Sequence, residues 1–335
     1  MVSRYCISVL LAACFFPAFT EVPGQVQYPI RREDLAVYAD AKTALDASPE
    51  ELFERYPELK KTLSFTRDQE KLGPLLQHVG ERVADFFRTF KDTSSAEEVL
   101  QQMTDRRGYG KTIHSRFMYL MLADPGKDYT IEEYRGDDNG KPLDLLGSEG
   151  GFLLASRLLG QLRFFLPRMQ PESGFRYLGT TSNPNAHVIA FAQKPEHPTT
   201  VGTLMTPNGQ KILLYQGLVW IDAGTYQVLR MKSDLLAPRT DIWLDRQTTD
   251  IEFQEVRFSD ERTLWLPREV RVEAVYMHTT YRNRHRYSDY KRFTVESRDE
   301  IKRPKVPPAG SESSSSTSGI APRSSPAHGA GRMGL

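Results

Sequence analysis

The sequence predicts an α+β fold in which a curved antiparallel sheet, an incomplete β-barrel, wraps around a helix and follows an N-terminal helical segment. Three observations predict this fold. Apolar residues recur every three or four positions before residue 111, apolar and polar residues alternate along short runs after residue 112, and one apolar helical pattern interrupts those runs. We expect curvature because twist makes a sheet of roughly nine strands coil or close.

The clearest element is a β-hairpin over residues 211–236, KILLYQGLVWIDAGTYQVLRMKSDLL. Its two arms flank the residues DAGT at 222–225, and a Gly-containing loop of this length between β-rich runs is typical of a hairpin. The first arm is apolar on both faces, so we expect it to be covered on both sides. The second arm carries Arg230, Lys232 and Asp234 on one face, which we expect to be half solvated.

Residues 25–111 are predicted to be mainly helical. We expect a first helix at 33–45 and a second that begins at Ser48-Pro49-Glu50-Glu51, which has a capping residue, a proline and an acidic first turn in the right order. The best pattern lies at 72–90, where leucine, valine and phenylalanine form an unbroken apolar stripe. This stripe must be buried against another part of the molecule.

A further short helix is predicted from Ser94 or Ser95 to about Met103. Either serine would serve as its N-cap, and Glu97 and Glu98 would lie in its first turn, where acidic side chains are favoured.

The alternating runs after residue 112 are expected to be antiparallel strands joined by short turns, because such closely spaced strands do not form βαβ units. In one of them the apolar parity switches, which predicts a β-bulge near Gln254. Apart from the hairpin, the expected strands are 117–122, 129–135, 175–181, 187–193, 251–258, 264–276 and 285–296.

The helix predicted at 151–169 is the segment on which a binding function would depend. If it lies across the concave sheet, its apolar face would share a ligand cavity with the first arm of the hairpin. The alternative is that the helix fills the sheet completely, as any core helix would. The expected cavity residues are Phe152, Leu158, Leu162 and Phe165 of the helix and Leu218 and Trp220 of the strand.

Residues 1–24 are interpreted as a secretory signal peptide. Arg4 precedes the uncharged apolar run 5–19, and a run of about 15 residues is shorter than the roughly 20 that a membrane-spanning helix needs. We therefore expect an exported protein, in the periplasm or outside the cell.

The four residues LAAC that end at Cys14 resemble the lipobox of bacterial lipoproteins. On this interpretation Cys14 would be acylated, and the chain would be a membrane-anchored lipoprotein. The alternative is ordinary cleavage near Gly24, in which case we expect no membrane association. The chain has two cysteines, Cys6 and Cys14, so no disulfide is expected after the signal segment.

Residues 303–335 are rich in serine, proline and glycine, and we expect a disordered tail there. The expected divisions are thus a signal peptide at 1–24, a helical region at 25–111, a half-barrel at 112–302 and the tail at 303–335.

The charge of the chain is nearly balanced, with a formal net value of +1, so no general field favours nucleic acid. One segment, 281–292, is strongly basic and aromatic. Its residues Arg282, Arg284 and Arg286 are candidates for contact with anionic groups such as lipid head groups. The alternative is a strand with a solvated, charged face, whose ion pairs contribute little.

No catalytic, cofactor or metal motif was found. The histidines lack the spacing of metal ligands, and no G-x-S-x-G elbow is present. The run 107–112 lacks the first glycine of a phosphate loop, which Asp105 replaces. These observations predict a non-enzymatic protein without a cofactor or metal, and an exported hydrolase is kept as a remote alternative.

The segments GLVWID at 217–222 and QVLRM at 227–231, followed by Leu266-Pro267 at the head of a late strand, resemble the bacterial lipoprotein-carrier superfamily, LolA- and LolB-like. The resemblance covers roughly residues 112–302, whereas the helical preface and the tail depart from the family pattern. It implies an open barrel whose apolar concave face holds a lipid or a lipoprotein acyl chain beneath movable helices. It is also compatible with an envelope protein partner, and the alternative function is a structural or interaction module with a filled core.

Overall fold

The computed structural model describes residues 16–17, 32–124, 129–137, 141, 143, 153–154, 158–196, 198, 200–206, 209–259 and 262–293. The predicted signal segment apart from residues 16–17, Cys14, Phe152 and the predicted tail lie outside the described residues. Within the described part of the chain, no helix is both long and apolar enough to span a membrane.

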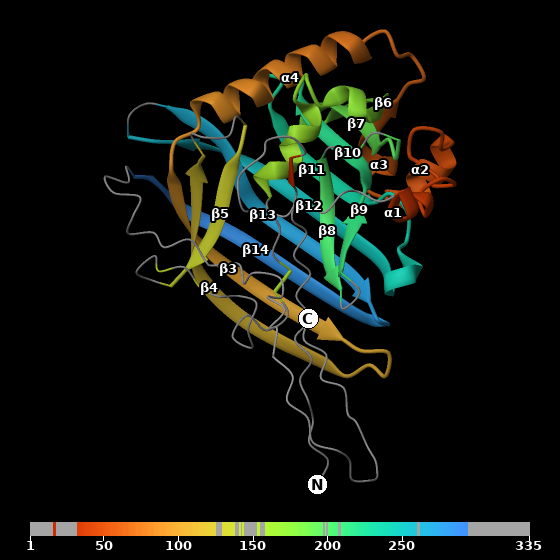
Figure 1. Cartoon of the computed structure of the whole chain (residues 1–335). Helices are drawn as coiled ribbons and strands as arrows, with labels where there is room; N and C mark the ends of the chain where they lie inside the picture. The colour runs from red at the N-terminus through yellow and green to blue at the C-terminus, as the bar shows by residue number, and fades with distance from the viewer. Residues whose placement is uncertain are drawn as a thin grey trace, which may run out of the picture.

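The molecule is built on one open antiparallel sheet of eleven strands, in the order β2-β6-β7-β10-β11-β12-β13-β14-β3-β4-β5 (Figure 1). The sheet curves strongly, as its twist requires, and the predicted fold class is confirmed. The strands are β2 (Leu63–Phe65), β3 (Thr93–Thr104), β4 (Gly110–Ala123), β5 (Ile131–Gly136), β6 (Ser173–Ser182), β7 (Asn185–Gln193), β10 (Tyr215–Asp222), β11 (Val228–Leu235), β12 (Leu244–Arg257), β13 (Thr263–Tyr276) and β14 (Thr279–Arg292).

A smaller sheet has the order β1-β8-β9, with strands β1 (Phe16–Pro17), β8 (Thr200–Thr206) and β9 (Gly209–Leu213). The first residues of the predicted hairpin, 211–213, belong to strand β9 and not to the hairpin itself. The hairpin proper is formed by β10 and β11, which pair in antiparallel register. Its turn is held by Asp222, whose Oδ1 accepts hydrogen bonds from the amides of Gly224 at 3.0 Å and Thr225 at 2.7 Å.

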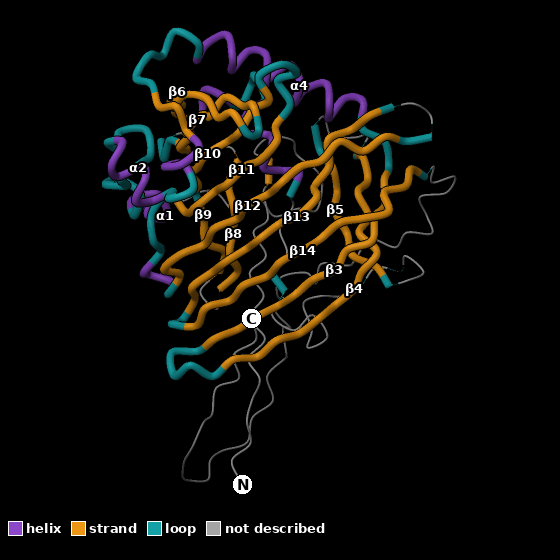
Figure 2. Tube along the Cα trace, turned by 180° about the vertical axis from the view of Figure 1, so that it is seen from behind, coloured by secondary structure: helices purple, strands orange, loops and turns teal. Residues whose placement is uncertain are grey.

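Three short helices, α1 (Arg32–Ala36), α2 (Pro49–Arg55) and α3 (Leu59–Thr62), lie against the outer face of the sheet near β7, β10 and β11 (Figures 1 and 2). Their buried residues Leu52, Tyr56 and Leu59 pack against Leu218 and Trp220 of β10. Strand β10 is therefore buried on both faces, as its sequence predicted, and β11 is partly exposed.

Two helices have the ends that the sequence indicated. Helix α2 begins with a capping box, in which Ser48 accepts from the Glu51 amide and the Glu51 carboxylate accepts from the Ser48 amide. Helix α4 (Leu72–Thr89) crosses one end of the sheet and buries Leu75, Val79 and Val83 from the predicted stripe. The first predicted helix is much shorter than 33–45, because α1 ends at Ala36.

The helix predicted from Ser94 or Ser95 to Met103 is wrong. These residues form β3, which pairs with β14 on one side and β4 on the other. The helix propensity of these residues is outweighed here by pairing with two neighbouring strands, which supply hydrogen-bond partners along the whole segment. The sheet therefore includes strands from within the region 25–111 that was expected to be helical.

The helix predicted at 151–169 is also corrected. Its described residues contain a 3₁₀ helix, η2 (Leu159–Phe165), followed by the short turn η3 (Gln170–Glu172), and another 3₁₀ turn, η4 (Thr240–Ile242), precedes β12. The bulge predicted near Gln254 is confirmed by a register shift between Glu252 and Phe253 opposite β13.

Candidate ligand-binding site

The inner face of the curved sheet is occupied by residues 158–166, which we call the inner segment. Its residues are buried, except Gly160, which is half-buried. Phe164 and Phe165 contact Phe191 of β7 with ring centroids 5.3 and 5.9 Å apart, and Phe165 also contacts Phe175 of β6. The apolar residues it places in the main core are Leu158, Leu159, Leu162, Phe164, Phe165 and Leu166.

The start of the inner segment is bound by a partly buried carboxylate. Glu133 of β5 accepts hydrogen bonds from the amides of Leu158 at 2.7 Å and Leu159 at 2.9 Å. The Tyr119 hydroxyl donates to the same carboxylate. These amides open a 3₁₀ helix and have no partner within it, so Glu133 supplies the acceptors that the segment itself lacks.

Two further polar contacts fix the inner segment along its length. The Ser233 hydroxyl of β11 donates to Gln161 Oε1 at 2.8 Å. At the far end, Gln170 Nε2 donates to the carbonyls of Phe165 and Leu76, both at 2.9 Å, which joins the segment to α4. The segment is thus apolar toward the sheet and is held by a small number of polar contacts.

Beside the inner segment lies a buried polar cluster, defined here as Glu97, Arg135, His285 and Tyr287. Arg135 donates to both oxygens of Glu97, with Nε to Oε2 at 2.6 Å and Nη2 to Oε1 at 2.8 Å. His285 Nδ1 and the Tyr287 hydroxyl each lie 2.8 Å from Glu97 Oε1. The carboxylate is fully buried, Arg135 compensates its charge, and His285 and Tyr287 add hydrogen bonds from another strand.

The surroundings of these groups change their pKa values. Burial alone would raise the pKa of Glu97, but the attraction of Arg135 and the hydrogen bond from His285 outweigh it and lower this pKa to about 2. Burial lowers the pKa of His285 and raises that of Glu133, despite the hydrogen bonds that Glu133 accepts. His285 is therefore held mainly in its neutral form.

The structure brings some of the predicted cavity residues together and separates the others. Leu158, Leu162 and Phe165 lie in one core beneath the sheet. Leu218 and Trp220 do not join them, because alternation along β10 turns these two toward the N-terminal helices. The residues of β10 that face the inner segment are Val219 and Ile221.

The predicted anionic-contact residues lie on the exposed face of β14. Two of them are paired with acidic residues of β13, Arg282 with Glu273 and Arg286 with Glu269. Arg284 lies between them and lines an outer hollow of about 760 Å³. Most of this face thus corresponds to the alternative of a charged, solvated strand surface.

The buried polar cluster was not predicted from the sequence. A signal was present on β14, where the inward residues Asn283, His285 and Tyr287 alternate with the three arginines. The role of Glu97 was not predicted because its segment was expected to be a helix. Its partner Arg135 is 38 positions away, and no local sequence pattern links the two residues.

No family model and no curated protein sequence matches the chain. Among solved structures, an outer membrane lipoprotein-sorting protein domain from Vibrio parahaemolyticus is 10% identical with a TM-score of 0.33, and the match covers 68% of this chain and 95% of that one. A LolA superfamily protein from Nitrosomonas europaea is 10% identical with a TM-score of 0.30, with 68% and 97% covered. The chain is similar to both of these solved structures at a low level.

A DUF1329 family protein from Desulfovibrio piger is similar to the same extent, at 12% identity and a TM-score of 0.35, with 69% of this chain and 98% of that chain covered. The likeness is low at these scores. It assigns no function to this chain.

Proposed function

We propose that this chain is an exported, non-enzymatic protein that binds a lipid, an acyl chain or another apolar ligand on the inner face of its sheet, in the place that the inner segment occupies. The observation that carries the proposal is the chemistry of that segment. Most of its side chains are aliphatic or aromatic, with Gln161 and Arg163 as buried polar residues, and the surface beneath it includes Val219, Met231 and Phe191. An acyl chain would meet the same apolar surface, so exchange would leave few polar groups unpaired.

The inner segment is suited to move because its internal hydrogen bonding is weak. A 3₁₀ helix has poorer hydrogen-bond geometry than an α-helix and seldom persists for more than a few residues. Glu133, Ser233 and Gln170 hold it at separate points, through contacts that can break one at a time. Binding would then require displacement of the segment, since the interior is packed when it is in place.

A cross-link across the Gln161–Ser233 contact tests this proposal. Both residues are replaced by Cys in a chain that carries Cys6→Ser and Cys14→Ser, and a short bis-maleimide joins them. We expect the joined protein to bind a fluorescent fatty-acid probe at least tenfold more weakly than the same variant before cross-linking. The matched controls are the two single-Cys variants treated with the same reagent, which should keep their affinity. Equal probe binding with and without the cross-link would contradict displacement.

The ligand class is tested on protein purified from its native host. We expect mass spectrometry of an organic extract to recover a lipid in near-stoichiometric amount. A variant with Leu162→Glu, which places a charge on the inner face, should yield much less, provided that its circular dichroism matches the parent chain. Recovery of no lipid from the parent chain would count against a carrier.

Acylation is tested separately by Cys14→Ser. If Cys14 carries the lipid anchor, this variant should leave the membrane fraction for the soluble one, and the Cys6→Ser control should not. Unchanged fractionation would favour cleavage near Gly24.

A second candidate is an envelope structural or interaction module. The observation that favours it is the packed interior, because the buried apolar side chains of the inner segment belong to the main core beneath the sheet. In that case both the cross-linked and the free protein would fail to bind the fatty-acid probe.

A further inference from the structure

Three large apolar side chains are exposed among the described residues, and all three lie in turns. Tyr109 is 61% exposed, Trp243 is 56% exposed and Met277 is 47% exposed. Tyr109 belongs to the turn between β3 and β4, Trp243 immediately precedes β12, and Met277 lies in the turn between β13 and β14. Exposed apolar residues that are scattered singly need no explanation, but those that gather in one place do.

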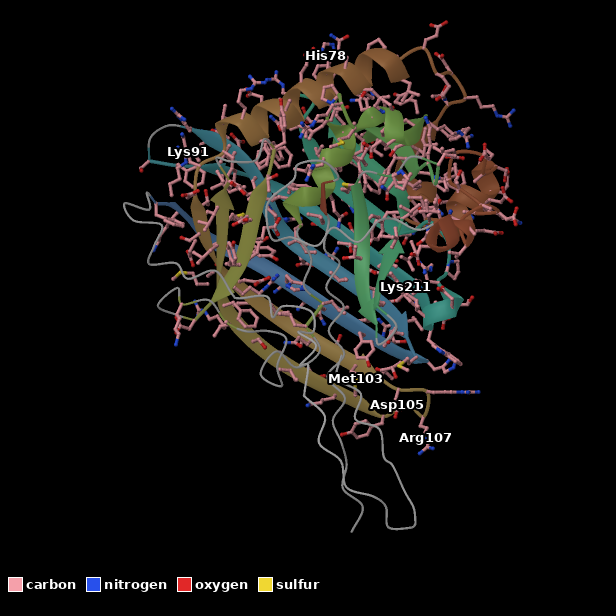
Figure 3. All side chains as sticks on the ribbon, viewed as in Figure 1. His78, Lys91, Met103, Asp105, Arg107 and Lys211 are labelled. Carbon is pink, nitrogen blue, oxygen red and sulfur yellow. The ribbon has the colours of Figure 1, made fainter. Side chains whose placement is uncertain are left out.

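These turns gather at one end of the sheet. The β13–β14 turn follows the pair Tyr276–Thr279, and Tyr276 also pairs with Leu244, next to Trp243. On the other side, Thr280 of β14 pairs with Thr104, the last residue of β3 before the turn that carries Tyr109. Figures 1 and 2 both show these hairpin ends side by side, and Figure 3 labels Asp105 and Arg107 at the β3–β4 turn. We call residues 105–109, 243 and 277–278 the rim.

The backbone of the rim is held in conformations that these side chains seldom adopt. Trp243, Met277 and His278 have φ values of 60°, 49° and 60°. Positive φ at both central residues of a two-residue hairpin turn normally selects Asn-Gly, yet here the residues are Met and His. Met277 donates its amide to the Trp243 carbonyl at 2.9 Å, and the Trp243 and His278 rings meet edge to face at 5.6 Å. Two exposed apolar side chains are thus fixed next to each other.

The rim is also basic. Arg106 and Arg107 lie in the β3–β4 turn with Lys111 just beyond it, all three are exposed, and none forms an ion pair within the described part of the chain. The carboxylate of Asp105 is directed into the turn, where it accepts from the amides of Arg107 at 2.9 Å and Tyr109 at 2.8 Å. Residues 105–111 therefore carry three cations and one anion, and Asp245 is an exposed acid nearby.

We propose that the rim is a docking surface for an anionic lipid bilayer. Tryptophan and tyrosine favour the membrane interface because one end of each ring system is apolar and the other polar, and Met277 supplies an apolar side chain that can enter between lipids. Arg106, Arg107 and Lys111 lie where they would meet lipid phosphates. The surface requires neither acylation of Cys14 nor a ligand on the inner face, so it does not rest on the proposed function.

The proposal is tested by flotation of the exported protein, carrying Cys14→Ser, with vesicles of phosphatidylethanolamine and phosphatidylglycerol, and with vesicles of phosphatidylcholine alone. We expect binding to the anionic vesicles to be at least tenfold stronger and to weaken as salt rises. Trp243→Ser combined with Met277→Ser should reduce it at least tenfold, and so should Arg106→Ser combined with Arg107→Ser. The charge-matched control, Arg88→Ser with Arg257→Ser, removes two exposed arginines elsewhere and should bind normally.

Thermal melting of each variant checks that the fold is kept, and tryptophan emission gives a second measurement. Emission should shift to the blue on addition of anionic vesicles, and this shift should disappear in the single variant Trp243→Ser. Of the other two tryptophans, Trp220 is buried, and the half-buried Trp265 lies near the start of β13, whereas the rim follows the end of that strand. The proposal is overturned if the parent protein does not bind anionic vesicles, or if the rim variants bind as well as the control. A failure of fatty-acid binding on the inner face would leave both measurements unaffected.

Discussion

The Arg135 guanidinium donates two hydrogen bonds to the Glu97 carboxylate, and this pair joins β5 to β3 across the intervening strand β4 inside the sheet. Both side chains are almost completely buried. The Arg135 side chain also lies over the Tyr119 ring, 5.3 Å from its centroid, so β4 takes part in the same contact. The pair thus connects three neighbouring strands of the sheet, β3, β4 and β5.

Removing one partner of this pair should be strongly destabilising. Arg135→Met leaves the Glu97 carboxylate buried without its main counter-charge, and we expect the free energy of unfolding to fall by about 3–5 kcal/mol. Urea denaturation followed by circular dichroism measures the change. The double variant Glu97→Met with Arg135→Met should lose less than the sum of the two single variants, because it leaves no unpaired charge.

The matched control for this prediction is Arg246→Met, which breaks the exposed pair with Glu273. Exposed ion pairs contribute about 0–1 kcal/mol, so little change is expected. Equal losses in Arg135→Met and Arg246→Met would show that burial of the first pair does not matter.

His285 should make stability depend on pH. Burial lowers its pKa below the ordinary value, so the unfolded chain binds a proton more readily than the folded one. The stabilisation is therefore complete above about pH 6.5 and is lost as the pH falls from there toward the lowered pKa. Relative to His285→Gln, the parent protein should lose up to about 1.4 kcal/mol per pH unit in this window.

Urea denaturation of both proteins between about pH 7.5 and about pH 5.5 measures this difference. The comparison gives the contribution of the His285 imidazole alone, because Glu133 titrates in both proteins. Parallel pH profiles of the parent and the variant would contradict the prediction.

Gly217 in β10 should not tolerate a side chain. A Cβ at this position would overlap the carbonyl oxygen of Lys232 on the neighbouring strand β11, where the backbone cannot move without breaking the hairpin. We expect Gly217→Ala to lower the free energy of unfolding by more than about 2 kcal/mol.

Gly73→Ala provides the control, because nothing lies within 4 Å of the added Cβ in α4. This change should raise stability by up to about 1 kcal/mol through helix propensity. Thermal melts of the two variants should therefore shift in opposite directions, and a shift of both in the same direction would argue against the overlap.

Glu133 should control the local opening of the inner segment. In Glu133→Gln one of the two oxygens becomes an amide donor, so one of the amides of Leu158 and Leu159 loses its acceptor. Losing an acceptor at a buried amide costs about 1–3 kcal/mol, so hydrogen exchange at these amides should accelerate roughly 5- to 150-fold.

Exchange in the β10–β11 hairpin should stay unchanged in the same variant. Glu132→Gln, one residue earlier, is the control, because the Glu132 carboxylate accepts from Tyr134 and makes no contact with the inner segment among the hydrogen bonds found. Equal exchange in both variants would mean that Glu133 does not hold the segment.

The parts of the fold that the sequence predicted are those in which local and distant interactions agree. The β10–β11 hairpin has a turn stabilised by Asp222 and arms with apolar residues on the correct faces, so its own residues contain the information. The capping box at Ser48 is local in the same way. In both cases the deciding contacts lie within a few positions along the chain.

The failures occur where the deciding partner is distant. Residues 93–104 place Thr93, Ser95 and Gln101 on their buried face, so no apolar alternation marks them as a strand. The buried Glu97 is compensated only by residues of β5 and β14. The alternation along β10 was predicted correctly, but both of its faces are equally apolar. The sequence therefore could not indicate which face packs against the inner segment and which packs against the N-terminal helices.

The strand at one edge of the sheet, β2, has three residues and pairs with only one end of the ten-residue β6. The strand at the opposite edge, β5, has six residues. These short strands pair only with Gly179–Thr181 of β6 and with Met118–Ala123 of β4, so the rest of each neighbouring strand is left outside this pairing. Loss of β2 would uncover more of β6, to which a strand of a second molecule could then pair.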